Sequence, residues 1–115
     1  GNFPTESMGK ECIVVRCDGH GIPELLDAIL EVFPLDTYVE NPVNLMEVMK
    51  GDNVKTPIWD EYKNIIGKHD DRGSNVISTI ERFKFYEEAK KAYAIIATGE
   101  KALYANVILQ KGVVI

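Results

Sequence analysis

Two histidines lie in polar segments that could carry acid–base chemistry or hold a metal ion. His20 belongs to the turn at residues 18–21, directly after an apolar run, where an imidazole could take or give a proton. The alternative is an ordinary solvated turn histidine. His69 lies beside carboxylates at residues 68–71, but this segment has no helical spacing that would fix a ligand geometry, so we expect no metal there.

Two further segments offer side chains suited to a sugar. Arg82 presents a planar fork of N–H donors that can bind a polyol or a carboxylate, and the alternative is a surface ion pair with Glu81 or Glu88. Tyr104 and Asn106 both donate and accept hydrogen bonds, which suits an array of neutral sugar hydroxyls. The alternative there is a tyrosine at a strand edge and an asparagine in a turn.

The apolar pattern predicts an α/β domain in which His20 and Arg82 follow strands and Tyr104 enters one. We expect a largely parallel sheet, with ligands gathered at the carboxyl ends of the strands. The helix at 85–98 has the clearest pattern, with an apolar stripe before Gly99 and an ion pair between Glu87 and Lys91. Strands are expected at 12–16, 45–49, 76–80 and in two runs within 104–115, and helices at 22–33, 57–66 and 85–98.

Composition restricts the class of protein. The 115 residues, 45% hydrophobic, correspond to one globular domain. Thirteen Lys and Arg against eighteen Asp and Glu give a net charge of −5, the wrong sign for a partner bound through nucleic-acid phosphates. No apolar run approaches the roughly 20 residues that cross a bilayer, so no membrane partner is expected. Cys12 and Cys17 are five apart in a predicted strand and face opposite sides of it, which favours reduced thiols and a cytoplasmic location.

Several segments together resemble the RbsD/FucU family. Residues 82–100, which begin Arg-Phe-Lys-Phe-Tyr, and residues 104–112, which begin Tyr-Ala-Asn, closely resemble the C-terminal half of its fucose mutarotase branch. Residues 16–19 and 34–40 resemble the animal form of that branch. The resemblance covers essentially the whole chain. It implies a single domain over residues 1–115, with a three-layer αβα fold and a largely parallel, mixed sheet.

The resemblance also implies a function. Members of this branch are isomerases that interconvert the α and β anomers of L-fucose by acid–base opening of the ring, without a cofactor or a metal. They act as cytoplasmic homo-oligomers whose sites lie near subunit interfaces. By motif match, Arg82, Tyr104, Ala105 and Asn106 bind the sugar, Ala105 through its backbone, and Tyr104 is also the candidate catalytic residue. The alternatives are a D-ribose pyranase of the same family and a non-catalytic monosaccharide-binding module.

One family feature has no counterpart in this sequence. Family members carry an upstream Gly-His-Gly-Asp-Glu motif, whose histidine donates the proton, and then a sugar-binding aspartate; this chain starts with Gly1 and the segment Asn-Phe-Pro at 2–4 that follows them. His20 falls in a later segment and does not replace that histidine. The resemblance therefore predicts a truncated domain. We expect the domain alone to be a weak or inactive mutarotase with a sheet that is partly uncovered. With the upstream residues, we expect it to be an active mutarotase.

Overall fold

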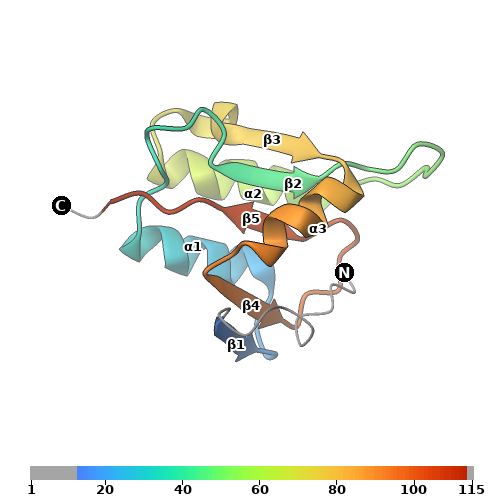
Figure 1. Ribbon diagram of the computed structural model, residues 1–115, viewed down its shortest axis with the longest axis horizontal. Helices are drawn as coiled ribbons and strands as arrows, with labels where there is room; N and C mark the ends of the chain where they lie inside the picture. Colours follow the sequence, from blue (N-terminus) through green and yellow to red (C-terminus); the bar gives the residue numbers. More distant parts are fainter. Residues whose placement is uncertain (1–12, 114–115) are drawn as a thin grey trace.

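The computed structural model describes residues 13–113 (Figure 1). Strands and helices alternate along most of this range, as the sequence pattern predicts. No helix within the described range is long and apolar enough to cross a membrane. The elements in chain order are β1 (Ile13–Cys17), α1 (Ile22–Val32), β2 (Val43–Met46), α2 (Pro57–His69), the 3₁₀ helix η2 (Gly73–Val76), β3 (Ile77–Ile80), α3 (Arg82–Lys90), β4 (Ala94–Thr98) and β5 (Val107–Leu109).

The strands form two separate sheets. β1 pairs with β4 in parallel, and the other three strands lie in the order β3-β2-β5. In this second sheet β2 is parallel to β3 and antiparallel to β5. Figure 1 shows α3 in front of the three-stranded sheet and α2 behind it. The predicted α/β architecture with largely parallel, mixed pairing is confirmed.

The buried residues of β2 serve two layers. Val43 and Leu45 belong to a hydrophobic cluster with residues of α1 and α2. Because side chains alternate along a strand, Met46 points to the opposite face, where α3 packs against β2. Met46 is 4% exposed, and Phe85 and Ala89 of α3 are buried as well. The cluster on the α1 and α2 side consists of Leu26, Leu30, Leu35, Val43, Leu45, Ile58, Tyr62, Ile66, Val76 and Ala105.

The β1–β4 pair is far less covered than the three-stranded sheet. Ile13, Val14 and Val15 are 46%, 39% and 44% exposed, and Ile96 of β4 is 38% exposed. Neighbouring residues of a strand point to opposite faces, so both faces of β1 are accessible to solvent.

The helix expected at 85–98 is wrong over its second half. α3 begins at Arg82 and ends at Lys90, and residues 94–98 form β4 instead. The N–H groups of Lys91 and Ala92 turn back to carbonyls three residues earlier, which closes the helix. Tyr93, predicted to be buried, is 81% exposed. Glu87 pairs with Lys90 and Glu88 with Lys91, in place of the predicted Glu87–Lys91 pair.

Other boundaries differ by a few residues. β2 covers residues 43–46 rather than 45–49, and α2 continues through Gly67, predicted to end it, as far as His69. The strand predicted at 76–80 begins at Ile77, after a 3₁₀ turn. Cys12 and the last two residues of the predicted C-terminal strand lie outside the described residues.

Glu100 ties the end of β4 to the start of α1. Its carboxylate accepts hydrogen bonds from the backbone N–H of Ile22 at 2.9 Å and from that of Ala102 at 3.1 Å. Desolvation by burial opposes ionisation, but these backbone donors outweigh it and hold the pKa of Glu100 below its usual range. The N-cap residue Gly21 has no side chain to cap α1, so a residue distant in the sequence supplies the acceptor.

A carboxylate of α1 also joins the two helices behind the sheet. Asp27 Oδ1 lies 2.7 Å from His69 Nε2 and 3.2 Å from Lys68 Nζ, both at the end of α2. The hydrogen bonds from His69 and Lys68 hold the pKa of Asp27 below its ordinary value. A carboxyl whose pKa is lowered by folding stabilises the folded state above its unfolded pKa, and this contribution disappears as the pH falls through the folded pKa.

We therefore expect Asp27→Asn to lower the melting temperature at pH 7 and to have progressively less effect as the pH falls below about 4. Thermal unfolding of both proteins from pH 7 to about pH 2.5 measures this. Asp60→Asn is the matched control. The side chain of Asp60 is 80% exposed, and its contact with Lys63, at 4.0 Å, is long for an ion pair. A difference between wild type and Asp27→Asn that stays constant with pH would contradict the expectation.

Candidate functional site

The register of the three-stranded sheet brings the predicted sugar-binding residues to one edge. Met46 pairs with Ile80, and Leu45 pairs with Val107. The carboxyl ends of β2 and β3 therefore meet the amino end of β5. We call this the carboxyl edge and define it by Arg82, which follows β3, and by residues 104–106, which precede β5.

Arg82 is the first residue of α3, and the residue before it, Glu81, caps the helix. Glu81 is the N-cap, and its carboxylate accepts hydrogen bonds from the N–H groups of Phe83 at 3.0 Å and Lys84 at 3.1 Å. This carboxylate is engaged in capping, and Glu88 pairs with Lys91. The ion-pair alternative for Arg82 is thus not what the structure shows.

The guanidinium of Arg82 is partly unsatisfied. Its Nε is buried, and within residues 13–113 it has no hydrogen-bond partner. A buried donor left without an acceptor costs about 1–3 kcal/mol. The cost falls if the side chain shifts so that a ligand oxygen reaches Nε, so a ligand rich in oxygen acceptors is compatible with this position.

Helix α2 holds the backbone of the 104–106 segment. The indole Nε1 of Trp59 donates to the carbonyl of Tyr104 at 2.8 Å, and the hydroxyl of Tyr62 donates to the carbonyl of Ala105 at 2.6 Å. Ala105 is 1% exposed, so its methyl group belongs to the core. Two aromatic side chains of α2 therefore hold the backbone directly before Asn106, and so fix the position of Asn106.

Burial makes Tyr62 a dependable donor. Tyr62 is fully buried, and desolvation, with smaller effects of Glu100 and Glu61, raises the pKa of its phenol well above the ordinary value. The hydroxyl is therefore protonated at neutral pH and can donate to Ala105.

The turn at Tyr104 has an unusual backbone. Tyr104 has a φ of 54°, and it is the only non-glycine residue with a positive φ in the described part of the chain. Its hydroxyl accepts a hydrogen bond from the N–H of Met49 and donates one to Asp52. Tyr104 thus lies in a turn before β5, and not in the strand predicted from the sequence.

The two histidines lie in other contacts. His20 follows β1, its side chain is 53% exposed, and its Nδ1 lies 2.8 Å from Glu24 Oε1, which agrees with the solvated alternative. His69 contacts Asp27 on α1, whereas Asp70 contacts Arg72. Lys68 and His69 thus turn to Asp27, and Asp70 turns to Arg72. No group of three or more His, Cys, Asp or Glu side chains in residues 13–113 is placed to hold a metal ion.

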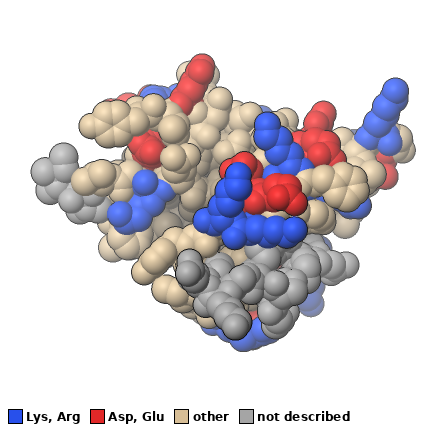
Figure 2. Space-filling model, in the orientation of Figure 1, with Lys and Arg blue, Asp and Glu red and all other residues tan. Residues whose placement is uncertain are grey.

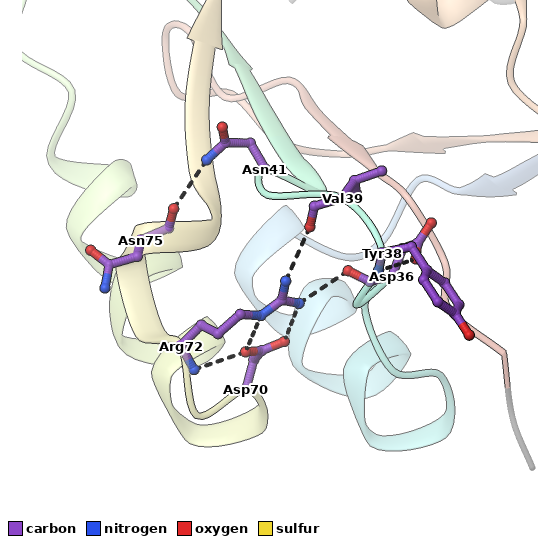
Figure 3. A network of polar contacts seen from close by, with 7 residues as sticks. All are labelled: Asp36, Tyr38, Val39, Asn41, Asp70, Arg72 and Asn75. Carbon is purple, nitrogen blue, oxygen red and sulfur yellow. Dashed lines mark hydrogen bonds and ion pairs between the residues drawn. The ribbon is translucent and has the colours of Figure 1, made fainter.

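Arg72 organises a second polar network (Figure 3). Its guanidinium donates to Asp70 and to the carbonyls of Val39 and Asp36, and the contact with Asp70 holds the pKa of that carboxyl below its usual value. The open hollow beside it, about 310 Å³, is lined partly by Tyr38. Because four hydrogen bonds of the Arg72 guanidinium join the 36–41 loop to Asp70 at the end of α2, we interpret this network as structural.

Charges of both signs mix on the face of the molecule that Figure 2 presents. Acidic and basic side chains of the described residues lie side by side near the middle of this face, so they form no continuous basic patch there.

Sequence reasoning missed three residues that contact the 104–106 segment of the carboxyl edge: Asp52, Trp59 and Tyr62. A signal existed for the two aromatics, since a buried Tyr or Trp needs a partner for its polar atom. The sequence placed Tyr62 on the apolar face of α2 but did not indicate its acceptor. Asp52 has no such signal, because it lies in an irregular loop.

We expect Tyr62→Phe to destabilise the protein by about 1–3 kcal/mol, because it leaves the buried carbonyl of Ala105 unsatisfied. Urea unfolding followed by circular dichroism measures the change. The matched control is Tyr93→Phe, which removes a hydroxyl from a residue that is 81% exposed and should leave the free energy of unfolding within about 0.5 kcal/mol. Equal effects of the two variants would show that the Tyr62 bond contributes nothing.

Three comparisons place this chain among known proteins. A family model described as the RbsD / FucU transport protein family matches residues 1–114. A human protein named fucose mutarotase is 49% identical over 118 residues, which cover 97% of this chain and 74% of the human one. The solved structure of FucU from Bifidobacterium longum is 63% identical, with a TM-score of 0.95, over 100% of this chain and 80% of that one. The solved structure of the fucose mutarotase from Streptococcus pneumoniae in complex with L-fucose is 47% identical, with a TM-score of 0.87, over 99% of this chain and 79% of that one.

Proposed function

This chain belongs to the RbsD/FucU family, and we propose that it is a fucose mutarotase, which interconverts the α and β anomers of L-fucose. The predicted family is confirmed. The observation that carries the function is the near-complete coverage of this chain by relatives that bear that name, in animals and in bacteria. That the solved Streptococcus pneumoniae relative is a complex with L-fucose adds support for the sugar.

The carboxyl edge offers the groups that this reaction needs. Opening the ring requires a proton at the ring oxygen and removal of the proton of the anomeric hydroxyl, and each positioned acid or base typically contributes about 10² to 10⁴ in rate. We assign sugar binding to Arg82, Tyr104, Ala105 and Asn106, and a part in proton transfer to Tyr104. The buried, unpartnered Nε of Arg82 supports its assignment. The bond between the anomeric carbon and the ring oxygen breaks and re-forms with proton transfers and no change of oxidation state, so the proposal includes no cofactor.

The same proposal extends to the oligomeric state of the protein and to its location in the cell. We propose a cytoplasmic homo-oligomer whose sites lie near subunit interfaces. The aromatic side chains of Tyr38, Phe83 and Tyr93 support association, because they are 92%, 70% and 81% exposed.

Exchange spectroscopy tests the function. The rate of exchange between the anomeric proton signals of L-fucose is measured with and without the 115-residue chain, with the Streptococcus pneumoniae relative as positive control. We expect saturable binding of L-fucose and faster exchange than without protein, but slower exchange than with the relative, as the resemblance predicts for this sequence. A larger acceleration for D-ribose would favour the pyranase alternative, and binding without acceleration would identify a sugar-binding module. The absence of both binding and acceleration would overturn the proposal.

A further inference from the structure

The hydroxyl of Tyr104 is held by the loop between β2 and α2, which covers residues 47–56. The N–H of Met49 donates to this hydroxyl at 3.2 Å, and the hydroxyl donates to Oδ2 of Asp52 at 2.5 Å. Asp52 lies 52 positions before Tyr104 in the sequence. The loop therefore places a carboxylate against a residue of the carboxyl edge.

These two contacts decide which role remains for the hydroxyl. A phenol has one proton to donate and two lone pairs that accept. The proton is directed to Asp52 and one lone pair is used by Met49, so a single lone pair remains. A hydrogen bond from a hydroxyl to a carboxylate is short and about twice as strong as a neutral one, which keeps the proton in this direction. Tyr104 thus faces a ligand as an acceptor.

The backbone alone does not set this geometry. Tyr104 adopts a φ of 54°, which costs energy for a residue with a side chain, and its carbonyl is bound by Trp59. Trp59 thus fixes one end of the residue and Asp52 fixes the other. Both partners come from the β2–α2 loop and the first turn of α2, and not from strands β3 and β5, which border Arg82 and Asn106.

We propose that Asp52 is a positioning residue of the sugar site, which fixes the hydroxyl of Tyr104 as the acceptor for a sugar hydroxyl. This inference rests on the proposed function, because it assigns Asp52 a part in that reaction. Asp52 acts through Tyr104, and its effect therefore depends on the hydroxyl of that residue.

A double-mutant cycle tests the dependence. L-fucose exchange at saturating sugar is measured for wild type, Asp52→Ala, Tyr104→Phe and the double variant, with thermal unfolding to show that each is folded. We expect each single variant to lose about tenfold in exchange rate and the double variant to lose no more than one of them. Losses that multiply, or Asp52→Ala with the wild-type rate, would overturn the proposal.

A conservative variant separates positioning from a general effect of charge. Asp52→Asn keeps a side-chain oxygen that accepts a hydrogen bond, so it should retain at least about a third of the wild-type rate. A loss as large as that of Asp52→Ala would contradict the role of acceptor. Asp60→Ala, which removes an exposed carboxylate on α2, is the control. It should accelerate the exchange of the L-fucose anomers as much as wild type does.

A measurement without sugar separates this inference from the proposed function. The ring carbon Cζ of Tyr104, which carries the hydroxyl bonded to Asp52, should give an NMR signal in the free protein that shifts in Asp52→Ala. If wild type neither binds L-fucose nor accelerates its exchange, the proposed function fails and takes the role of Asp52 with it. If wild type is active but Asp52→Ala keeps both the position of the signal and the rate, only the inference about Asp52 fails.

Discussion

Gly99→Ala is expected to destabilise the protein by about 3 kcal/mol or more, the largest effect of any single substitution considered for the fold. A methyl group at Gly99 would stand 2.1 Å from the carbonyl oxygen of Asp18. That oxygen belongs to the backbone, so no side chain can swing aside to make room. The N–H of Gly99 also donates to the carbonyl of His20 at 2.9 Å, and this bond would be stretched as the chains separate.

The loss of stability in Gly99→Ala should be greatest in the β1–β4 pair. Gly99 directly follows Thr98, which pairs with Cys17, so the clash lies where both strands end. This pair is already the least covered part of the described fold, and it has little packing energy to offset the strain. Urea unfolding gives the loss of stability, and amide hydrogen exchange shows whether residues 94–98 lose protection first.

Two glycines serve as controls for Gly99. Gly19 lies in the adjacent turn, where an added methyl group would meet no atom within 4 Å, so Gly19→Ala should change the stability by less than about 1 kcal/mol. Gly67 lies inside α2 and is equally unhindered, so Gly67→Ala should stabilise the helix by about 0.5–1 kcal/mol. A Gly99→Ala protein as stable as the Gly19→Ala protein would refute the steric argument.

Arg82→Ala is expected to weaken L-fucose binding and exchange by about tenfold to a hundredfold, because hydrogen bonds from a charged donor contribute about 1.5–3 kcal/mol. The same substitution should barely affect folding. The Nε of Arg82 is buried without a partner, so the side chain gives the folded protein less than a fully satisfied arginine would. Exchange spectroscopy and thermal unfolding on the same samples measure both effects.

Two further variants show how the loss of L-fucose binding in Arg82→Ala arises. Arg82→Lys keeps the charge but not the planar fork, and we expect it to recover little of the loss. Lys84→Ala removes an exposed cation from the same helix and should leave both binding and stability unchanged. If Arg82→Ala lost stability and binding together, Arg82 would be a structural residue and the carboxyl edge would need another cation.

The fold was most predictable where local signals agree with tertiary packing. α1 begins with Pro23 in its first turn and carries Leu26 and Leu30 on its buried face, so periodicity and helix-start signals point the same way. α2 was equally clear, apart from its end. There, Gly67 has no neighbour that forbids a helical backbone, and the helix passes through it.

The region after Lys90 shows why periodicity alone fails. Ala92, Tyr93 and Ile96 continue the spacing of Phe85 and Ala89, so the pattern fits a longer helix. The chain instead pairs residues 94–98 with β1, a contact between segments far apart in the sequence that no local window contains. The β-branched side chains of Ile95, Ile96 and Thr98 favour that strand, and the alanines between them are compatible with either structure.

The sequence proposed the members of the candidate site but not the residues that support them. Arg82, Tyr104, Ala105 and Asn106 were proposed from a motif match, and the strand register brings them to one edge. What fixes them could not be read from the sequence, since Trp59 and Tyr62 reach the carbonyls of Tyr104 and Ala105 across separations of 45 and 43 positions. Such bonds depend on how α2 packs beneath the sheet.

Titration of the isotopically labelled chain with L-fucose, followed by amide NMR signals, tests the central claim most directly. The claim is that the carboxyl edge binds the sugar. It predicts that the amide signals of Ala105, Asn106 and Phe83 shift in a saturable way, while those near His20 and His69 do not. Saturable shifts confined to residues 19–24 would contradict it and would move the site to the end of β1.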